Sequence, residues 1–392
     1  MKKVFIVDAV RTPIGSFGGV LSSLSAVDLG AMVIRAIIER QPVTPDSIDE
    51  IFMGNVCQAN LGQAPARQAA LNSGLPPKVP CTTVNKVCSS GLKSVMFGAQ
   101  SIMLSQADII IAGGMESMSN IPYYVTQARW GYKYGGGELV DGLERDGLMD
   151  AYDRQAMGVF ADRTATHYHI SREEQDEYAI QSYRRSAASS QEGKFSSEII
   201  PVRIPQRKGD VLLVEEDEEY KKVFFDKIPS LRPAFSLDGT VTAANASTIN
   251  DGASALLLAS EKAIKEYGLH PLAEIIGFSD AAREPQWFTT APVLAAPRAI
   301  ERAGLKINDI DIFEVNEAFA VVPLAFGREL NVSTDRMNIH GGAVSLGHPL
   351  GASGARILTT LVHALHFQGR ETGCATLCNG GGGASALVIK KV

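Results

Sequence analysis

The stretch from residue 82 to residue 114, TTVNKVCSSGLKSVMFGAQSIMLSQADIIIAGG, decides the fold class of this chain. It leads from a β-rich run through Cys88 into a helical pattern over 89–104, and then into the apolar strand 109–114. A later stretch, GHPLGASGARILTTLVHALHFQGRETGCATLCNGGGG at 347–383, also runs from loop to helix to strand to glycine turn. Two copies of one βα architecture would bring their helix N-termini to one central crevice, where α/β folds bind ligands. A chance likeness between two α/β segments would look the same, so the pattern alone leaves both interpretations open.

Short apolar runs alternate with longer helical patterns from the beginning of the chain. The run 4–7 precedes a helical pattern near 27–40, and the run 51–53 precedes another near 65–73. Apolar runs without a polar face indicate strands that are buried on both sides. The chain is therefore predicted to be an α/β protein with parallel strands.

The middle of the chain, residues 120–250, has a different composition. It is rich in glycine, tyrosine and charged residues, and it includes helical patterns such as 172–190. We interpret it as a large inserted loop domain, although any single turn of it is equally compatible with a mobile surface excursion. The predicted division is an N-terminal half made of 1–119 and 251–270, the inserted loop domain, and a C-terminal half made of 271–392.

Composition argues against several classes of partner. The chain has 392 residues, of which 45% are apolar, and a formal net charge of -6. Because nucleic acids and anionic membranes require a basic surface, we expect neither as a partner. The first apolar run is stopped by Asp8 and Arg11, so no signal peptide is expected, and no stretch has membrane-spanning length. Five cysteines, an odd number, then predict reduced thiols and a cytoplasmic location.

Cys88 stands just before a helical pattern, followed by Ser89, Ser90 and Gly91. The positive end of the helix dipole and the unpaired N–H groups there favour a thiolate, and the same groups can bind an oxyanion. Taken alone, the residue is more readily explained as a small buried apolar side chain.

Cys378 ends an apolar strand and is followed by Asn379 and four glycines. Glycines let backbone N–H groups approach a ligand beside the thiol. The same glycines would also make a simple tight turn, and both interpretations stay open.

His348 and Asn316 are the other candidate catalytic residues. Small residues flank His348 on both sides, and its imidazole can act as a base for a thiol or as a donor to an oxyanion. Asn316 follows the strand 310–313, where its amide can hold an ordered water. Alternatively, Asn316 caps a helix that begins at Glu317. His340 has no such setting and is interpreted as structural.

The sequence contains no zinc-type spacing of cysteines and histidines. It also lacks a P-loop and a GxGxxG motif at a first helix, so nucleotide phosphates would have to be bound in another way.

Four blocks of this sequence resemble the signature blocks of the thiolase family and occur in the same order. They are Val84-Asn85-Lys86-Val87-Cys88-Ser89-Ser90-Gly91, Asn316-Glu317-Ala318-Phe319, Gly347-His348-Pro349 and Cys378-Asn379-Gly380-Gly381-Gly382. The resemblance runs from Val4 to the C-terminus. Related ketoacyl synthases carry histidine or asparagine in place of Cys378, so the second cysteine separates the two families. The resemblance implies a thiolase-like fold of two similar βα halves in five layers, α-β-α-β-α, with an inserted loop domain.

The resemblance also implies a mechanism. Cys88, activated by His348, would attack an acyl-CoA thioester and hold the acetyl group. Cys378 would remove a proton from a second acetyl-CoA, and the carbanion would attack the acetyl group on Cys88. His348 and a water held by Asn316 would stabilise the enolate, and the N–H groups of Cys88 and Gly380 would receive the other oxyanion.

The implied activity is that of an acyl-CoA C-acetyltransferase, which condenses two acetyl-CoA molecules reversibly, with coenzyme A as substrate and product. The blocks at 239–247 and 378–386 look closer to acetoacetyl-CoA thiolases than to long-chain degradative members. By the same resemblance, Ser247 would contact the pantetheine, Met157 the acyl end, and Lys222 and Lys227 the phosphates of coenzyme A. Positions matching a potassium site are Tyr183, Ala243, Ala244, Ala246 and Val344.

One position departs from the family pattern. Short-chain biosynthetic thiolases commonly have His-Met-Gly where this chain has Ala156-Met157-Gly158. The missing imidazole leaves room beside the acyl pocket, so a degradative 3-ketoacyl-CoA thiolase of broader chain length is the alternative. A thiolase-like lipid or coenzyme A carrier without catalysis is a third hypothesis, which the intact catalytic set disfavours. By resemblance we also expect a homo-oligomer, a dimer of dimers, with 120–145 as the tetramer contact.

Overall fold

The N-terminal half of the protein is a mixed five-stranded sheet. In the computed structural model, which describes residues 2–206 and 209–392, its strand order is β4-β3-β5-β10-β1. The strands are β1 (Val4–Arg11), β3 (Glu50–Gly54), β4 (Cys81–Val84), β5 (Ile109–Ser117) and β10 (Asn250–Ser260). Strands β3, β4 and β5 are parallel, but β10 runs antiparallel to both of its neighbours. The predicted parallel strands are therefore confirmed for β3, β4 and β5 but not for β10, because the chain returns through the insertion to enter β10 from the opposite end.

The C-terminal half repeats this arrangement. Its strands are ordered β12-β13-β14-β11, with β12 and β13 parallel and β14 antiparallel to its neighbours. A short antiparallel pairing of β11 with β1 joins these strands, the second sheet, to those of the N-terminal half, the first sheet. They are β11 (Ala273–Ala282), β12 (Ile312–Val315), β13 (Thr372–Asn379) and β14 (Gly383–Lys391). A parallel bridge between Phe313 and Met337 in this half corresponds to the parallel pairing of β3 with β4 in the first half. The internal repeat of the sequence is thus a repeat of strand order, and the chance likeness is ruled out.

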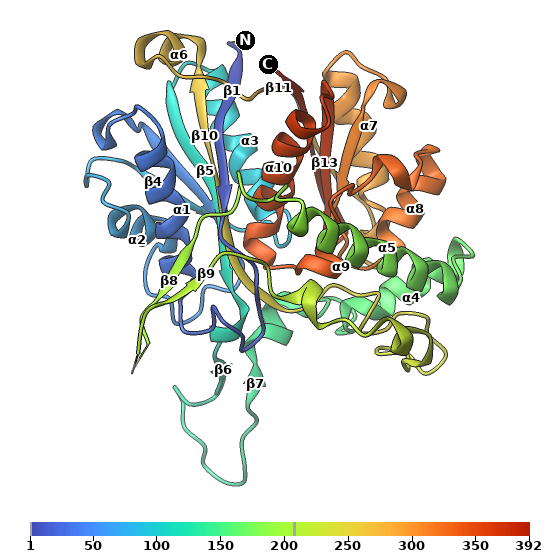
Figure 1. The fold of residues 1–392 in the computed structure, drawn as a ribbon. Helices are drawn as coiled ribbons and strands as arrows, with labels where there is room; N and C mark the ends of the chain where they lie inside the picture. Colours follow the sequence, from blue (N-terminus) through green and yellow to red (C-terminus); the bar gives the residue numbers. More distant parts are fainter. Residues whose placement is uncertain (1, 207–208) are drawn as a thin grey trace.

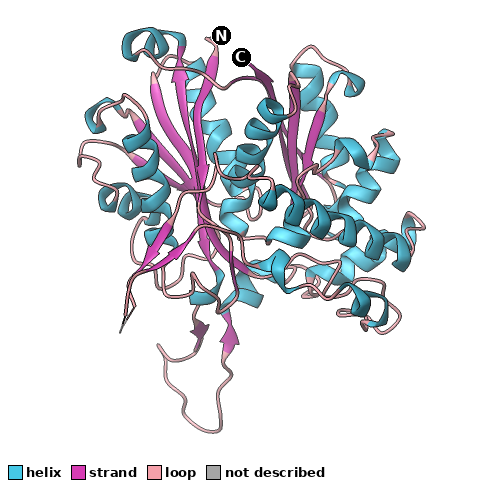
Figure 2. Cartoon of the chain, viewed as in Figure 1, coloured by secondary structure: helices cyan, strands magenta, loops and turns pink. Residues whose placement is uncertain are grey.

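The helices complete five layers, α-β-α-β-α, which confirms the predicted fold class (Figure 1). Helices α1 and α2 cover the outer face of the first sheet, α3 and α10 lie between the two sheets, and α7 packs on the outer face of the second. Figure 2 shows the strands enclosed by helices on both sides. The helices are α1 (Ala26–Arg40), α2 (Pro65–Asn72), α3 (Ser90–Met103), α4 (Met157–His167), α5 (Arg172–Gln191), α6 (Glu261–Tyr267), α7 (Pro292–Arg302), α8 (Val321–Leu330), α9 (Ala343–Leu346) and α10 (Leu350–Phe367).

Glycines bring the two central helices into close contact. A Cβ on Gly91 of α3 would lie 2.8 Å from the backbone nitrogen of Ala355, and one on Gly354 of α10 would lie 2.4 Å from that of Leu92. Real Cβ atoms do not approach backbone so closely, so only glycine allows this spacing. The two helix N-termini are consequently held side by side, as the repeat predicted.

The insertion between β5 and β10 contains helices α4 and α5 and two short strand pairings. A hairpin with β6 (Tyr123–Tyr124) and β7 (Val140–Asp141) projects away from the body of the molecule (Figure 1). A second hairpin pairs β8 (Val202–Ile204) with β9 (Leu212–Val214), and β2 (Gly15–Ser16) pairs with β10. The helix predicted over 172–190 is α5. The three-part division of the chain stays a prediction.

In the described parts of the chain, no helix is both long and apolar enough to cross a bilayer.

Candidate active site

The four predicted catalytic residues lie at the ends of elements in the two halves. Cys88 stands two residues before α3, and His348 stands two residues before α10. Cys378 is the last residue but one of β13, and Asn316 directly follows β12, which begins two residues later than the predicted strand. All four side chains are buried. Both halves of the duplicated fold therefore contribute candidate residues, from separate parts of the sequence, at the ends of their elements.

Cys88 sits in a tight turn against the glycine turn after β13. Val87 has a left-handed φ of 48°, and the backbone N–H groups of Gly380 and of Cys88 itself point at the thiol. Burial nevertheless raises the pKa of Cys88 to about 11, against the lowering effect of these N–H groups. The N–H groups at the helix start favour the thiolate, as predicted, but desolvation outweighs them in the resting protein. The thiol needs a base.

Cys378 lies close enough to Cys88 for the two thiols to interact electrostatically. Burial raises the pKa of Cys378 far above its usual range, and a charge on Cys88 raises it further. The strand position opposite Cys378 is Ala384 of β14, across the Gly380–Gly382 turn. The glycines do make a tight turn, and this turn also presents the N–H of Gly380 to Cys88.

His348 is held as a neutral base. Its Nδ1 lies 2.6 Å from the hydroxyl of Ser353, which itself donates to the carbonyl of Pro349 at 2.9 Å. Since that hydroxyl has a single proton, the arrangement assigns the imidazole proton to Nδ1 and leaves the lone pair on Nε2. Nε2 has no hydrogen-bond partner within the described residues. Burial lowers the pKa of His348 to about 3, so the ring is neutral at working pH.

Asn316 has both ends of its side-chain amide buried without a partner in the described chain. Its backbone N–H donates to the carbonyl of Thr376 at 3.0 Å, which joins it to β13. The next helix, α8, begins only at Val321 with Ala320 as its N-cap, so the alternative that Asn316 caps a helix at Glu317 is wrong. Buried amides are normally satisfied by protein or ordered water, which suits the predicted water-holding role.

A cavity of about 540 Å³ opens beside these residues and is bordered by His348, Met157 and Ser247. The Ser247 hydroxyl donates to the carbonyl of Ala318 at 2.9 Å, which leaves its lone pairs turned toward other partners. Most of the lining is apolar: Phe17, Met118, Leu148, Ala234, Phe235, Ala243, Ala246, Ile249, Phe319 and Leu350. The arrangement suits a ligand with a long, mainly apolar arm whose reacting end reaches His348.

The two predicted phosphate-binding lysines lie at the mouth of this cavity and next to it. Lys222 borders the main cavity and also a neighbouring one of about 190 Å³, whose lining includes Lys227. Lys222 pairs with Glu218 at 2.8 Å, and Lys227 places its ammonium 4.7 Å from the ring centre of Phe224. Both ammonium groups are thus engaged within the protein.

The structure brings the predicted potassium positions together only in part. Tyr183 packs against Val344, and Tyr183 and Ala244 line the smaller cavity. Ala243 and Ala246 border the main cavity.

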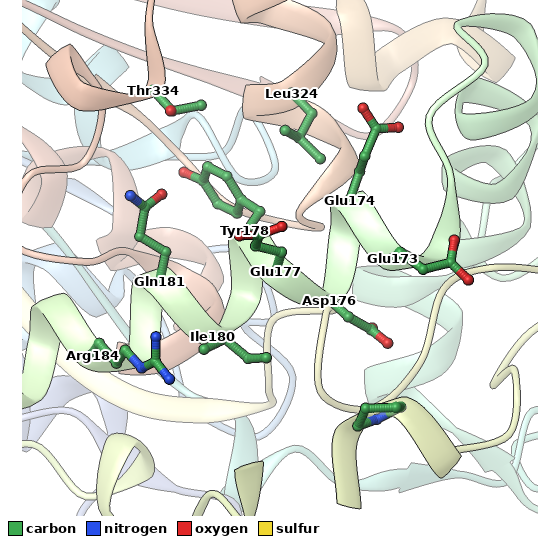
Figure 3. A pocket seen from close by; sticks show the side chains of 11 residues that line it. Glu173, Glu174, Asp176, Glu177, Tyr178, Ile180, Gln181, Arg184, Leu324 and Thr334 are labelled. Atoms are coloured by element: carbon green, nitrogen blue, oxygen red, sulfur yellow. The ribbon is translucent and has the colours of Figure 1, made fainter. Parts of the chain in front are cut away.

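A larger hollow of about 710 Å³ lies elsewhere on the molecule, along α5 (Figure 3). Acidic side chains border it, namely Glu173, Glu174, Asp176 and Glu177. None of its lining residues borders the cavity at His348, and it contains no cysteine or histidine. It lacks the thiols and the imidazole that the predicted reaction uses and is therefore not the candidate active site.

The prediction missed Glu116, a buried carboxylate behind the two helix starts. It accepts hydrogen bonds from the backbone N–H groups of Val56 at 3.0 Å, Cys57 at 3.2 Å and Gly351 at 2.8 Å. Burial raises the pKa of Glu116 to about 7, although these hydrogen bonds favour the carboxylate. A charged residue directly after an apolar strand was the available signal.

Asn250 was also missed. Its side-chain oxygen accepts the backbone N–H of His348 at 2.9 Å, and its amide donates to the carbonyl of Gly15 at 3.0 Å. Nothing local in the sequence connects it with a loop almost a hundred residues away.

Comparisons with known proteins agree with this geometry. Residues 4–262 match the family described as thiolase, N-terminal domain, and residues 269–391 match thiolase, C-terminal domain. An acetyl-CoA acetyltransferase from Schizosaccharomyces pombe is 53% identical over 391 residues, covering 100% of this chain and 99% of the relative. A relative from Gibberella zeae named acetyl-CoA acetyltransferase ERG10, cytosolic, is 50% identical over 390 residues, covering 99% and 98%. The crystal structure of Acat5 thiolase from Ascaris suum in complex with coenzyme A has a TM-score of 0.94 and 48% identity, over 100% of both chains. With both family domains matched in order along the chain, this protein belongs to the thiolase family.

Proposed function

We propose that this protein is an acyl-CoA C-acetyltransferase that condenses two acetyl-CoA molecules to acetoacetyl-CoA and coenzyme A, and catalyses the reverse thiolysis. The observation that carries the proposal is the pair of interacting buried thiols, Cys88 and Cys378. The neutral imidazole of His348, which borders the cavity, is proposed to serve them as base. The names of the relatives from Schizosaccharomyces pombe and Gibberella zeae support the same activity.

The first half of the reaction is acetyl transfer to Cys88. The Nε2 lone pair of His348 takes the proton of the Cys88 thiol, and the thiolate attacks the thioester carbon of acetyl-CoA. The bond from that carbon to the sulfur of coenzyme A breaks, and the leaving thiolate receives the proton from His348. The N–H groups of Cys88 and Gly380 stabilise the oxyanion that forms in between.

The second half forms the carbon–carbon bond. Burial keeps the Cys378 thiol protonated at rest, so the neutral imidazole of His348 first takes its proton. The Cys378 thiolate then removes a proton from the methyl group of a second acetyl-CoA. The carbanion attacks the acetyl carbon on Cys88, the carbon–sulfur bond to Cys88 breaks, and the released Cys88 thiolate recovers a proton from the imidazolium of His348. His348 and a water bound by Asn316 stabilise the enolate oxygen during this step. Because an α-proton of a thioester is very weakly acidic, this stabilisation must supply several kcal/mol.

The cavity of about 540 Å³ is proposed to bind the pantetheine arm of coenzyme A, with Ser247 along the arm and Met157 at the acyl end. Lys222 and Lys227 are proposed to approach the phosphates, which requires Lys222 to leave Glu218. Coenzyme A in the Ascaris suum structure supports this assignment.

A potassium ion fits the region of Tyr183, whose pKa is raised by burial and by the carboxylates of Glu219 and Glu317. Negative charge of this kind and backbone carbonyls suit a hard monovalent cation. The proposed ligands are Tyr183, Ala243, Ala244, Ala246 and Val344. When bound, the ion would supply positive charge that orders the loops beside the pantetheine.

The protein is proposed to act as a cytoplasmic homo-oligomer, a dimer of dimers. The hairpin that carries β6 and β7 supports the second contact, since its side chains Trp130 and Tyr134 are 83% and 101% exposed. Exposed aromatic residues at the end of a projecting hairpin are typical of a contact surface.

Acyl-chain length separates the leading proposal from the alternative, a degradative 3-ketoacyl-CoA thiolase. The purified protein should cleave acetoacetyl-CoA much faster than 3-ketooctanoyl-CoA, measured with and without potassium. Equal rates on the two substrates would favour the alternative.

Active-site variants separate an enzyme from a carrier. Cys88→Ala should abolish thiolysis of acetoacetyl-CoA, and wild-type rates in that variant would refute the mechanism.

A further inference from the structure

Lys86, two residues before the nucleophile Cys88, reaches across the boundary between the two halves. Its ammonium donates to Asp280 Oδ1 at 2.6 Å, to Ser385 Oγ at 2.8 Å and to the carbonyl of Ala384 at 3.0 Å. The acceptors belong to β11 and β14 of the C-terminal half, while Lys86 follows β4 of the N-terminal half. Only 26% of the lysine side chain is exposed. The ammonium thus has three convergent protein partners and little contact with solvent.

The backbone between Lys86 and Cys88 is a tight turn that transmits any shift of the lysine. The N–H of Lys86 donates to the Ser90 hydroxyl at 2.8 Å, and that hydroxyl donates to the carbonyl of Val87 at 2.6 Å. The carbonyl of Lys86 accepts the N–H of Ser89 at 3.1 Å. These hydrogen bonds tie the turn to the first residues of α3, so Lys86 and Cys88 occupy one locally closed unit.

Two of the three groups that accept hydrogen bonds from Lys86 belong to the strand next to the second cysteine, Cys378. Ala384 is the strand partner of Cys378 in the β13–β14 pairing, and Ser385 is the partner of Leu377. The Ser385 hydroxyl also donates to Asp280 Oδ1 at 2.6 Å, which connects β14 with β11. The ammonium of Lys86 is therefore bound to the residue directly across the ladder from Cys378.

Asp280 stays charged at any working pH. Burial alone would raise its pKa, but hydrogen bonds from Lys86, Lys93 and Ser385 hold the pKa at about 2. Lys93 of α3 binds the other carboxylate oxygen, Oδ2, at 2.6 Å. Lys93 thus shares the charge interaction with Asp280, but its side chain makes no hydrogen bond to β14 in the described part of the chain, and it lies outside the Cys88 turn.

We propose that Lys86 is a positioning residue that sets the separation of the two catalytic sulfurs by joining the Cys88 turn to the strand opposite Cys378. The inference rests on the two-cysteine reaction of the proposed function. Formation of the carbon–carbon bond requires the carbanion made at Cys378 to reach the acetyl group on Cys88, so it depends on this separation. Acetyl transfer to Cys88 depends on His348 and on the oxyanion N–H groups, of which that of Gly380 lies in the turn after Cys378. It does not use the Cys378 sulfur, so it should be less sensitive to the separation of the two sulfurs than the carbon–carbon step. Misplacement of about 1 Å between reacting groups can cost roughly 100-fold in rate.

The test compares two reactions of the full-length enzyme. Exchange of labelled coenzyme A into acetyl-CoA reports acetyl transfer to Cys88, and formation of acetoacetyl-CoA reports the carbon–carbon step. In Lys86→Met, condensation should fall roughly 10- to 100-fold while exchange stays within about threefold of wild type. The matched control Lys93→Met also deprives Asp280 of one positively charged partner. In this control, exchange and condensation should both stay within about threefold of wild type.

Several results would overturn the inference. One is an equal loss of exchange and condensation in Lys86→Met, and another is the same ratio of the two rates in Lys86→Met and Lys93→Met. Should Lys86→Met fold poorly, Lys86→Arg keeps the charge but presents a planar group to three acceptors that converge on an ammonium. It should still lower the ratio of condensation to exchange, and an unchanged ratio contradicts the proposal. A wild-type protein that exchanges coenzyme A without condensing acetyl-CoA would instead refute the proposed function, and this role of Lys86 with it.

Discussion

Replacing Ser353 by alanine should uncouple His348 from its catalytic orientation. The Ser353 hydroxyl lies 2.6 Å from Nδ1 of His348 and is buried, so alanine leaves the Nδ1–H group without a partner in a site that excludes water. An orphaned buried donor costs about 1–3 kcal/mol. The ring can recover part of this cost by rotating or by moving its proton to Nε2. Either change removes the lone pair that accepts the Cys88 proton.

If that cost appears in the transition state for acetyl transfer, the rate falls roughly tenfold for each 1.36 kcal/mol, so kcat should drop about 10- to 100-fold. The assay is rapid-quench measurement of acetyl-Cys88 formation, together with steady-state thiolysis of acetoacetyl-CoA. Ser94→Ala is the matched control, since the Ser94 hydroxyl is also buried and donates to a helix carbonyl, that of Ser90, at 3.0 Å. Both variants should lose similar thermal stability, but only Ser353→Ala should lose rate. A kcat in Ser353→Ala within about twofold of Ser94→Ala would refute the orientation of His348 inferred here.

Three further predictions follow from the same geometry. Burial raises the pKa of Cys88 to about 11 and lowers that of His348 to about 3, so both side chains are neutral near pH 7. Alkylation of Cys88 in the free enzyme should therefore be slower than alkylation of free cysteine, and its rate should rise with pH above 8. An inflection of the alkylation rate near pH 6.5 would contradict this. Ala156→His should narrow the acyl end of the cavity and lower kcat/KM for 3-ketooctanoyl-CoA more than for acetoacetyl-CoA, and an equal effect on both substrates would show that this position does not limit chain length. Replacing Trp130 and Tyr134 together by glutamate should halve the assembly mass seen by light scattering without changing the unfolding temperature of the protomer, whereas an unchanged mass would exclude the hairpin as a contact.

Much of the site was predictable from local patterns. Cys88, His348 and Cys378 each stand, with small neighbours, at a junction between a loop and a helix or strand. Such junctions are visible in the sequence because the spacing of apolar residues changes there. Burial of the strands was visible in the same way, because apolar runs without a polar face have only one stable environment. The direction of β10 was not predictable, since a strand has the same side-chain pattern whether it runs parallel or antiparallel to its neighbours.

Other parts of the site depend on long-range contacts. The protonated resting state of Cys88 was not predictable, because the desolvation of a thiol depends on everything packed around it, not on the residues next to it in the chain. Glu116 and Asn250 were missed for the same reason, since their partners at Gly351 and His348 are far away in the sequence.

The sequence by itself determined the reaction chemistry of this protein, because the types of side chain and their local setting select nucleophile, base and oxyanion donors. Only the tertiary structure decided the protonation states of these groups and their positions relative to one another. The protonation of His348, the pKa of Cys88 and the bridge from Lys86 to β14 all arise where the two halves meet. Each depends on burial and on distances between segments that only packing brings together, and neither quantity is encoded within a short stretch of chain.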